Sequence, residues 1–551
     1  MAGGILNLIA VGNANVILNG NPTKTFFKVV YSKYTNFGMQ KFRIDYDGLR
    51  ELRLTEDSHF SFKIPRYADL LMDTYVCVRM PDIWSPIYHP CLDTNDRWSS
   101  YDFRWIRDLG VQMIREITIT CGGQLLQRYS GEYMKVVAER DFPDIKKKLF
   151  DQMTGNVPEL NDPGNAYGRV SNYPSAYYIN STTTAEPSIR SRYLYIPINT
   201  WFTLDSRCAF PMVCLQYNEL VINVTMRPIQ ELFQIRDVFD YQNNFPYIQP
   251  DFNLPRFQMY RFLQSPPSYD ISDGNYQNTV QTWNADIHLL STYCFLSDEE
   301  RTQFALEDQV YLVKDVFEYT FENMVGTKKV KLNSNGMVSS WMWYFQRNDV
   351  NMRNEWGNYT NWPYFNMPKD VAPAPAERVN ILYNGDPING PALHPNAINT
   401  GYFTTGPFSQ ENIREIMVNM GIVLGGDYRE NLLPSGVFNY VEKYTRTSGF
   451  ARPGVYCYNF CLNTNPFDYQ PSGAINMSKF KTVELEITTI MPTVDTANTT
   501  FRVICNDDGS PIAVSKQNWR MYEYTYNMKL FEERYNVLSF IGGNCGMLYA
   551  R

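Results

Sequence analysis

The chain has 551 residues, enough for three or four average domains or for two large β domains. Apolar residues make up 44% and charged residues 19%, a composition that excludes a wholly disordered chain. The net charge is −7 and no run of five Lys or Arg occurs, so the chain lacks the basic excess of phosphate-binding proteins. The aromatic share of 15% favours strands and interfaces.

The N-terminal stretch, residues 5–18, is mildly apolar and uncharged. It fits an arm that docks on a partner or a lipid surface, or a terminal strand of the first sheet. The first 23 residues contain no Lys or Arg, unlike the basic start of a secretory signal, and no apolar run reaches about 18 residues. We therefore expect a chain that is not secreted, with its ten Cys as reduced thiols.

Six segments alternate apolar and polar residues with a period of two. This pattern predicts strands with one buried and one wet face, as in antiparallel sheets. The segments are residues 42–46, 117–121, 220–226, 317–321, 483–487 and 522–530.

Helical patterns are few and short. Ser297, followed three residues later by Glu300, is a capping-box pattern that predicts a helix from Asp298 to about Leu306. Weaker patterns predict helices over residues 131–140, 145–153 and 427–433. Pro434 would end the last of these.

Two long segments read as loops. Residues 154–190 are dense in Asn, Pro, Gly, Ser, Thr and Tyr, and residues 348–400 carry seven prolines. Both contain Tyr or Trp, which favours ordered surface excursions. Strands flank each loop, so the layout looks duplicated, with the boundary near residue 298. No short sequence repeat accompanies it.

No constellation for catalysis or metal binding emerges from the sequence. None of the four His lies within five residues of another, and Cys457 and Cys461 have no second ligand pair nearby. Glu484 and Glu486 fall on the solvent face of their strand. We predict no catalytic residue, no cofactor, no metal site and no enzymatic activity.

Five N-x-S/T sequons occur, and those at Asn180 and Asn358 lie in the long loops. Glycosylation requires an accessible acceptor, so these two are the candidate glycosylation sites. A chain rich in Asn, Ser and Thr also produces sequons by chance.

Seven sequence blocks, taken in order, span almost the whole chain. They begin with Gly3–Phe37, which contains the run NPTKTFFKVVY, and end with Arg534–Ala550. The others are residues 63–71, 115–134, 199–224, 295–305 and 456–480. Together they resemble the major capsid proteins of nucleocytoplasmic large DNA viruses, the group of the mimivirus, chlorovirus and iridovirus capsid proteins. Two mild departures lie at residues 459–462 and at Lys479, and residues 348–400 match the family poorly.

The resemblance implies an all-β fold: two tandem eight-stranded antiparallel jelly rolls (a double jelly roll) with long loop insertions and a few short helices. We expect an N-terminal arm over residues 1–27 and a first jelly roll over 28–297, with the loop 154–190. A helical linker over 298–308 then leads to a second jelly roll over 309–551, with the loop 348–400.

The resemblance also implies a major capsid protein, a structural subunit that trimerises into pseudo-hexagonal capsomers tiling the icosahedral shell of a large DNA virus. The implied partners are a homotrimer, neighbouring capsomers, and minor capsid and penton proteins. An internal viral membrane is a further candidate partner, and no direct contact with nucleic acid is expected. The implied location is the virion capsid shell, after assembly in the host cell cytoplasm.

Two alternatives remain open at this point, because a fold does not fix a function. One is a carbohydrate-binding or glycoside-hydrolysing β-sandwich protein, since loop Tyr and Trp suit sugars. A hydrolase of this kind would need two carboxylates facing each other across a cleft. The other is a double jelly-roll scaffold or minor shell protein.

Overall fold

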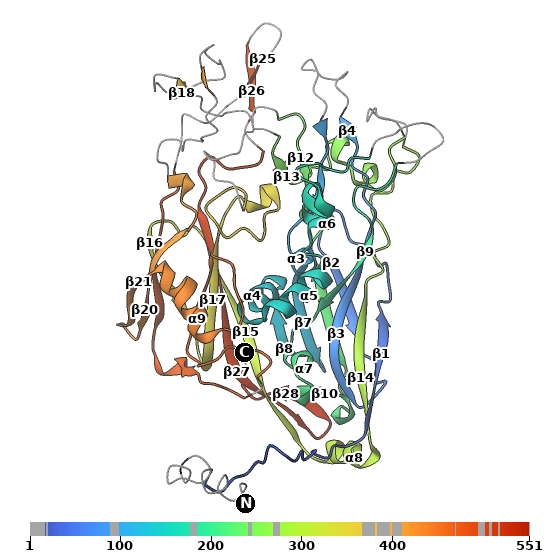
Figure 1. Cartoon of the computed structure of the whole chain (residues 1–551), viewed down its shortest axis with the longest axis vertical. Coiled ribbons are helices and arrows are strands. Elements are labelled where there is room, and N and C mark those ends of the chain that lie inside the picture. Colours follow the sequence, from blue (N-terminus) through green and yellow to red (C-terminus); the bar gives the residue numbers. More distant parts are fainter. Residues whose placement is uncertain are drawn as a thin grey trace, which may run out of the picture.

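The computed structural model describes residues 20–88, 99–176, 185–240, 245–267, 276–365, 410–468, 470–493 and 518–549. It also describes residue 17 and the short segments 381–382, 397–398, 502–505 and 510–515. Figure 1 shows two sandwiches of antiparallel strands side by side, with short helices between them and at their ends.

The first sandwich consists of two facing sheets. One sheet has the order β1 (Phe37–Asp45), β14 (His288–Leu296), β3 (Leu70–Met80) and β9 (Arg192–Pro197), and β10 (Phe210–Pro211) also pairs with β3. The other has the order β2 (Ser58–Lys63), β11 (Leu220–Met226), β7 (Ile114–Cys121) and β8 (Gln124–Tyr129).

The second sandwich repeats this plan. Its first sheet has the order β15 (Gln309–Phe321), β27 (Tyr526–Ile541), β17 (Met337–Arg347) and β22 (Val455–Asn459). Two short strands extend it, β23 (Ile475–Asn476) on β17 and β28 (Asn544–Met547) on β27. Its other sheet has the order β16 (Thr327–Leu332), β24 (Val483–Thr489), β20 (Met417–Leu424) and β21 (Asp427–Pro434).

The two sandwiches share one topology. When the eight main strands of each are counted along the chain, both give the order 1-8-3-6 in one sheet and 2-7-4-5 in the other. In each, the last strand lies between the first and the third. This arrangement confirms the predicted pair of antiparallel jelly rolls and the duplicated layout.

The buried faces of the strands follow the predicted alternation. In β11 and β24 every second residue is buried, which places Leu220, Ile222 and Val224 in one core and Val483, Leu485 and Ile487 in the other. The segment predicted as a strand from residue 522 enters β27 only at Tyr526.

The connections between strands gather at the two ends of the sandwiches (Figure 1). At the upper end lie a small sheet of β13 (Tyr247–Ile248), β12 (Phe233–Arg236) and β6 (Phe103–Trp105), and three short hairpins. The hairpins pair β4 (Ile87–Tyr88) with β5 (Ser99–Ser100), β18 (Ile381–Leu382) with β19 (Ala397–Ile398), and β25 (Arg502–Cys505) with β26 (Pro511–Ser515). The lower end carries α8 (Asp298–Leu306) and the N-terminal residues.

Three of the four predicted helices are present. They are α4 (Gly131–Asp141), α5 (Asp144–Thr154) and α8. Ser297 stands at the N-cap of α8 as predicted, but its side chain makes no capping hydrogen bond there.

The helix predicted over residues 427–433 was wrong. Residues 427–434 form β21, which pairs with β20 across a two-residue turn. Gly425 and Gly426 have φ angles of 66° and 103°, and positive φ at both central residues is the geometry of a tight β-hairpin. The turn therefore directs the following residues into the sheet.

Other helical segments escaped prediction. They are α3 (Leu109–Met113), α6 (Pro158–Asn161), α7 (Trp201–Leu204), a π-helical turn (Val437–Val441) and α9 (Glu442–Arg446). Single 3-10 turns cover Pro163–Gly168, Ser206–Cys208, Met212–Cys214, Ile229–Glu231, Pro255–Phe257, Met259–Arg261, Val350–Arg353, Gln410–Asn412 and Met477–Lys479. The segment 154–190, predicted as a loop, thus contains α6 and a 3-10 turn.

Candidate functional site: the contact surfaces of the two sandwiches

The described residues hold no group of three or more His, Cys, Asp or Glu side chains placed to bind a metal ion. Over the same part of the chain, no helix is both long and apolar enough to cross a membrane. The features that stand out are contact surfaces. One is buried between the two sandwiches, and others are exposed.

Helix α4 lies between the two sandwiches (Figure 1), and all 11 of its residues are buried. Ser130 caps it, because the Ser130 hydroxyl accepts a hydrogen bond from the Tyr133 N–H at 3.3 Å. Five of the buried residues are charged: Glu132, Lys135, Glu139, Arg140 and Asp141. A buried charge is costly unless it is paired, so each of these needs a partner.

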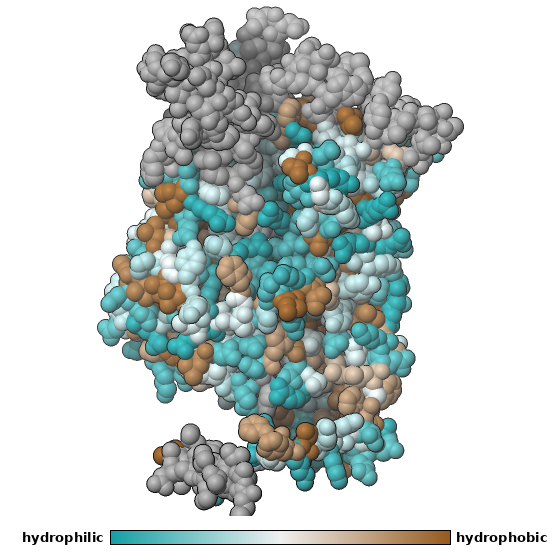
Figure 2. Space-filling model, in the orientation of Figure 1, coloured by the Kyte–Doolittle hydropathy of each residue, from teal (hydrophilic) through white to brown (hydrophobic). Residues whose placement is uncertain are grey.

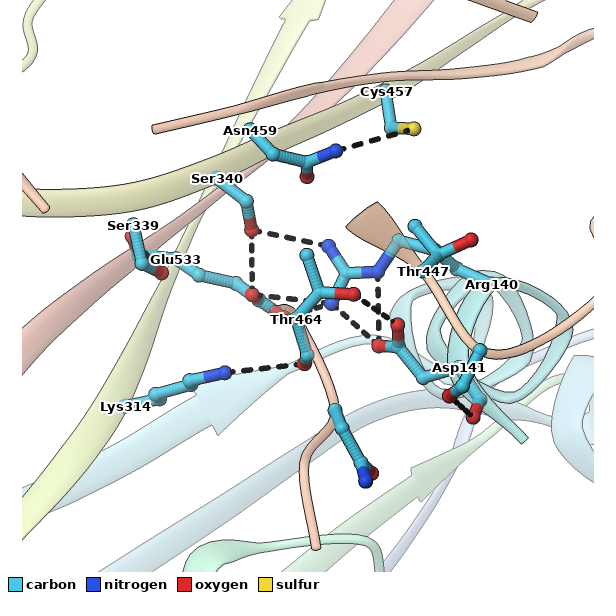
Figure 3. Close-up of polar contacts among 12 residues, drawn as sticks. Arg140, Asp141, Lys314, Ser339, Ser340, Thr447, Cys457, Asn459, Thr464 and Glu533 are labelled. Carbon is cyan, nitrogen blue, oxygen red and sulfur yellow. Dashed lines mark hydrogen bonds and ion pairs between the residues drawn. The ribbon is translucent and has the colours of Figure 1, made fainter. Parts of the chain in front are cut away.

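At the C-terminal end of α4, Arg140 and Asp141 meet the second sandwich (Figure 3). Arg140 Nη2 lies 2.6 Å from Asp141 Oδ2 and 3.1 Å from Oε1 of Glu533, on β27. Arg140 Nη1 donates to the hydroxyl of Ser340 on β17 at 3.0 Å, and that hydroxyl donates to Glu533 at 2.7 Å. Burial alone would raise the pKa of Glu533, but the charges of Arg140 and Lys314, with hydrogen bonds from Ser340 and Tyr133, together lower it to about 2.

At the N-terminal end of α4, Glu132 is the centre of a second cluster. It accepts hydrogen bonds from Arg227 at 3.1 Å, from Lys529 on β27 at 2.6 Å and from the Tyr344 hydroxyl on β17 at 2.7 Å. Burial opposes ionisation here too, yet the charges of Lys529 and Arg227 lower the pKa of Glu132 to about 2. Because Arg227 follows β11, the cluster joins strands of both sandwiches.

A third cluster connects α4 to the segment before β22. Lys135 Nζ lies 2.6 Å from Asp108 Oδ2, and Arg452 pairs with both Asp108 and Glu139. Buried ion pairs contribute little net stability, but breaking one leaves a charge without a partner. The three clusters therefore make one relative placement of the sandwiches strongly preferred over others.

Aromatic packing completes this interface. Tyr133 of α4 lies 5.8 Å from Phe531 of β27, and Phe210 of β10 packs edge-on against Phe540 of β27 at 5.1 Å. Phe531 and Phe540 belong to the same hydrophobic core as the first sandwich. The two sandwiches thus form one continuous body.

The N-terminal residues 20–36 form an exposed, extended segment. Phe26 and Phe27 are 88% and 99% exposed, and further large apolar side chains of this segment are similarly open to solvent. Lys24, Lys28 and Lys33 alternate with them. Figure 1 shows the segment leading away from the sandwiches at the end that carries α8. Contiguous exposed apolar side chains mark a surface that contacts another molecule.

The second sandwich carries its own exposed apolar side chains. Figure 2 shows hydrophobic patches along its side. The side chains come from β21 and from the helical segment 437–446, and they include Leu432, Tyr440, Val441 and Tyr444, the last 91% exposed. This surface lies on β21 and on the connection from β21 to β22, which are strands 5 and 6 of the second sandwich. In the first sandwich, the equivalent connection from β8 to β9 contains α4 and α5.

A cavity of about 900 Å³ opens near the upper end, lined by connections of both sandwiches. Of its carboxylates, Asp102 pairs with Arg236 at 3.4 Å and Glu355 with Arg104 at 3.6 Å. Arg104 also lies 3.6 Å above the ring of Tyr247. Asp102 and Glu355 thus each pair with a neighbouring guanidinium group.

The two candidate glycosylation sites have different outcomes. Asn180 lies outside the described residues, so its modification stays a prediction. Asn358 was expected to be accessible, and that expectation was wrong. It is 1% exposed, and its side-chain amide donates to the carbonyl oxygen of Trp362 at 2.9 Å. The segment around it is built into the sandwich, because Tyr359 stacks on Tyr344 at 4.1 Å.

The buried charges of α4 were not predicted from the sequence. Five charged side chains in eleven residues indicate a solvated helix, and the partners that bury them lie up to 397 residues away. The helix itself was predicted, but its burial on all sides was not.

Comparison with known proteins matches both halves of the chain. Residues 25–289 match the family model "Major capsid protein N-terminus", and residues 300–546 match "Large eukaryotic DNA virus major capsid protein". The chain is 23% identical to the major capsid protein of Phaeocystis pouchetii virus over the full length of both. It is 27% identical to capsid protein 1 of Acanthamoeba polyphaga mimivirus, over 62% of this chain and 48% of that protein. Its fold is similar to the crystal structure of PBCV-1 VP54, with a TM-score of 0.60, 18% identity, and coverage of 96% of this chain and all of the other.

Proposed function

Because the chain belongs to the family of large eukaryotic DNA virus major capsid proteins, we propose that it is the subunit that builds the icosahedral capsid shell of such a virus. The observation that supports this most directly is the match of both halves to capsid family models, in chain order. The chain acts by assembly, through the surfaces that it presents to other subunits.

The capsomer in this proposal is a homotrimer. Two sandwiches of one topology lie side by side, so three chains around a three-fold axis give six similar lobes in a pseudo-hexagonal outline. Contacts in such a ring are heterologous, because each subunit uses different patches toward its two neighbours. We take residues 28–297 and 309–551 as the two domains, with the helical linker 298–308 between them.

The fixed placement of the two sandwiches matters for this role. A lobe that rotated against its partner would break the six-fold pseudo-symmetry that side-by-side tiling needs. The three charge clusters around α4 disfavour such rotation, because it would separate buried charges from their partners.

The long loops are proposed to contact neighbouring subunits at the outer end. Residues 366–380, at the heart of the loop 348–400, lie outside the described residues, as do 177–184 of the loop 154–190. A deletion of residues 370–395 tests this, because it spares Tyr359 and the packed segment around it. We expect a folded protein with monomer mass in solution. A deletion variant of trimer mass would contradict the role of this loop.

The N-terminal arm is proposed to face the interior of the shell and to contact minor capsid proteins or an internal membrane. Its exposed Phe26 and Phe27 support a docking role. The double variant Phe26→Ser, Phe27→Ser should trimerise normally but form few closed shells. Normal yields of closed particles would exclude the arm as an assembly contact.

Negative-stain imaging and solution mass of the purified full-length chain test the proposal as a whole. We expect particles of trimer mass with a hexagonal outline. A monodisperse monomer at micromolar concentration would argue against the capsomer, and absence from purified virions would point to a scaffold protein.

A further inference from the structure

Two glycine hairpins meet where the end of the second sandwich docks on the first. One is the β7–β8 turn, with Gly122 and Gly123, and the other is the β27–β28 turn, with Gly542 and Gly543. The backbone N–H of Gln216 donates to the carbonyl oxygen of Gly543 at 3.2 Å. These contacts hold the C-terminal hairpin against the first sandwich.

Side chains next to the turns continue the contact. The side-chain amide of Asn218 donates to Asn544 Oδ1 at 3.3 Å. A Cβ on Gly546 would lie 3.1 Å from the Gln124 side chain. Gln124 of the β7–β8 hairpin and the segment 216–218 before β11 thus both touch the residues that flank Cys545.

The two thiols meet inside this contact. Cys121 ends β7 and pairs with Gln124 across the turn, and Gln124 lies against Gly546, the residue next to Cys545 in β28. Cys121 and Cys545 are 0% and 4% exposed, and both are free cysteines. Each belongs to a different sandwich, and they lie on strands whose positions are already fixed by hairpin pairing.

We propose that Cys121 and Cys545 are a modification site, and that they form a disulfide bond between the two sandwiches when the protein meets an oxidising medium. A disulfide needs two closely spaced cysteines with suitable backbone placement, and its strain rises when segments must move. Here the segments that carry the two cysteines are already in contact in the folded protein.

The chemistry is thiol–disulfide exchange with an external disulfide such as oxidised glutathione. The neighbouring Cys545 thiol lowers the pKa of Cys121, against the effect of burial, and the nearby Arg66 charge acts in the same direction. When local opening of the C-terminal hairpin exposes Cys121, its thiolate attacks the external disulfide and displaces one glutathione thiolate.

The second step completes the exchange. Cys545, whose pKa is raised by the neighbouring Cys121 and by burial, gives its proton to a released glutathione thiolate. It then attacks the mixed disulfide at the Cys121 sulfur and displaces the second glutathione. The two protein thiols are oxidised, the external disulfide is reduced to two thiols, and the two protons pass to the released glutathione thiolates. No other oxidant is required.

The bond forms within one chain, so it does not depend on trimer or shell formation. Its absence would leave the proposed capsid role untouched, and failure of that role would leave the bond untouched. Its physical effect is to tie the C-terminal hairpin to the first sandwich. The bond closes a loop from Cys121 to Cys545, which includes most of the sequence. It therefore lowers the conformational entropy of the unfolded chain.

The test uses the full-length protein incubated with oxidised glutathione, followed by denaturation, alkylation of the remaining thiols, proteolysis and mass spectrometry. We expect a linked peptide pair that contains Cys121 and Cys545 and disappears on reduction. The oxidised protein should migrate faster on a non-reducing gel, and its melting temperature should rise by about 2–4 °C.

Three variants make the test specific. Cys121→Ser and Cys545→Ser should each abolish both the linked peptide and the faster migration. Cys208→Ser removes a more exposed thiol elsewhere in the first sandwich and should keep both. The proposal is overturned if both thiols of the oxidised wild-type protein are still alkylated after denaturation, or if Cys121 is linked to a different cysteine.

Discussion

Arg140 and Glu533 face each other across the interface with side-chain exposures of only 1% and 2%. This ion pair contributes more to the relative placement of the two sandwiches than to the net stability of the protein. The attraction between them is largely offset by the loss of water around both groups. What the pair provides is a large penalty for any arrangement that separates it.

The substitution Arg140→Met tests this penalty. It leaves Glu533 and Asp141 buried without their cation, so we expect a loss of about 3–5 kcal/mol in the free energy of unfolding. Urea denaturation measures it. Arg301→Met, which breaks the exposed pair with Asp298, is the control and should cost less than about 1 kcal/mol.

A double variant separates charge from packing. Glu533→Gln in the Arg140→Met background removes one uncompensated charge, so part of the lost stability should return. If the double variant is less stable than Arg140→Met alone, the cost arises from packing rather than from charge.

Acid should destabilise the interface. Glu132 and Glu533 have an ordinary pKa of 4.5, and both are lowered to about 2 in the folded protein. The unfolded chain therefore takes up protons first, and the stability from these groups is present above about pH 4.5 and lost as the pH falls toward 2. Asp141, whose pKa is raised by burial, opposes the trend.

Melting temperatures measured between pH 6 and pH 2.5 check this prediction. We expect a steep fall below pH 4.5. A profile that is flat down to pH 3 would contradict the charge state assigned to Glu132 and Glu533.

At the scale of elements, Gly-Gly turns define the corresponding hairpins of the two sandwiches. Gly122 and Gly123 join strands 4 and 5 of the first, and Gly425 and Gly426 join strands 4 and 5 of the second. All four have positive φ angles, which glycine adopts without a steric cost. The same backbone requirement thus recurs at equivalent positions, although no sequence repeat is visible around it.

The substitution Gly426→Ala isolates this backbone requirement. A Cβ at Gly426 meets no atom within 4 Å, so the cost comes from its φ of 103° alone. We expect a loss of about 1–2 kcal/mol in the free energy of unfolding. Gly38→Ala is the matched control, because its Cβ also meets open space while its φ is not positive, and it should change stability by less than about 0.5 kcal/mol.

The sequence predicted strands better than helices, for a physical reason. In an alternating strand such as 220–226, successive side chains point to opposite faces of the sheet. The sequence of such a strand therefore shows which of its residues are buried. The mistaken helix at 427–433 shows the limit. Its residues have no strong strand pattern, and the preceding Gly-Gly turn decides their conformation. A hairpin reading of Gly425-Gly426 would have corrected it.

The candidate site was less predictable than the fold. The charges of α4 read as a solvated face, because their partners come from strands far away in sequence. The same holds for Asn358, whose loop is rich in turn residues but packs through Tyr359. When a residue is buried by segments that are distant in sequence, the local sequence pattern does not show that it is buried.

At the scale of the whole molecule, two copies of one topology are joined by a helix that belongs to the first and is buried against both. Their shared core includes Tyr344, Phe531 and Phe540 of the second sandwich. Among the described residues, no sheet contains strands of both sandwiches, but buried side chains of both sandwiches pack into one hydrophobic core.

A cut in the linker tests this joint packing. A protease site placed between Leu306 and Gln309, where the chain is exposed, should allow cleavage without separating the halves. The cleaved protein should elute at its original size on gel filtration. Expressed alone, residues 309–551 should aggregate, because they expose the surface that α4 covers. Two well-folded, separable pieces would disprove the joint packing.

The position of the last strand in each sheet has a consequence for synthesis on the ribosome. β27 lies between β15 and β17, so the sheet lacks its middle strand until residues 526–541 have been translated. A polypeptide that terminates early cannot close this sheet, and its unpaired edges remain open to chaperones and proteases. Strand order therefore acts as a check on completeness, because a chain that stops before β27 cannot complete the second sandwich.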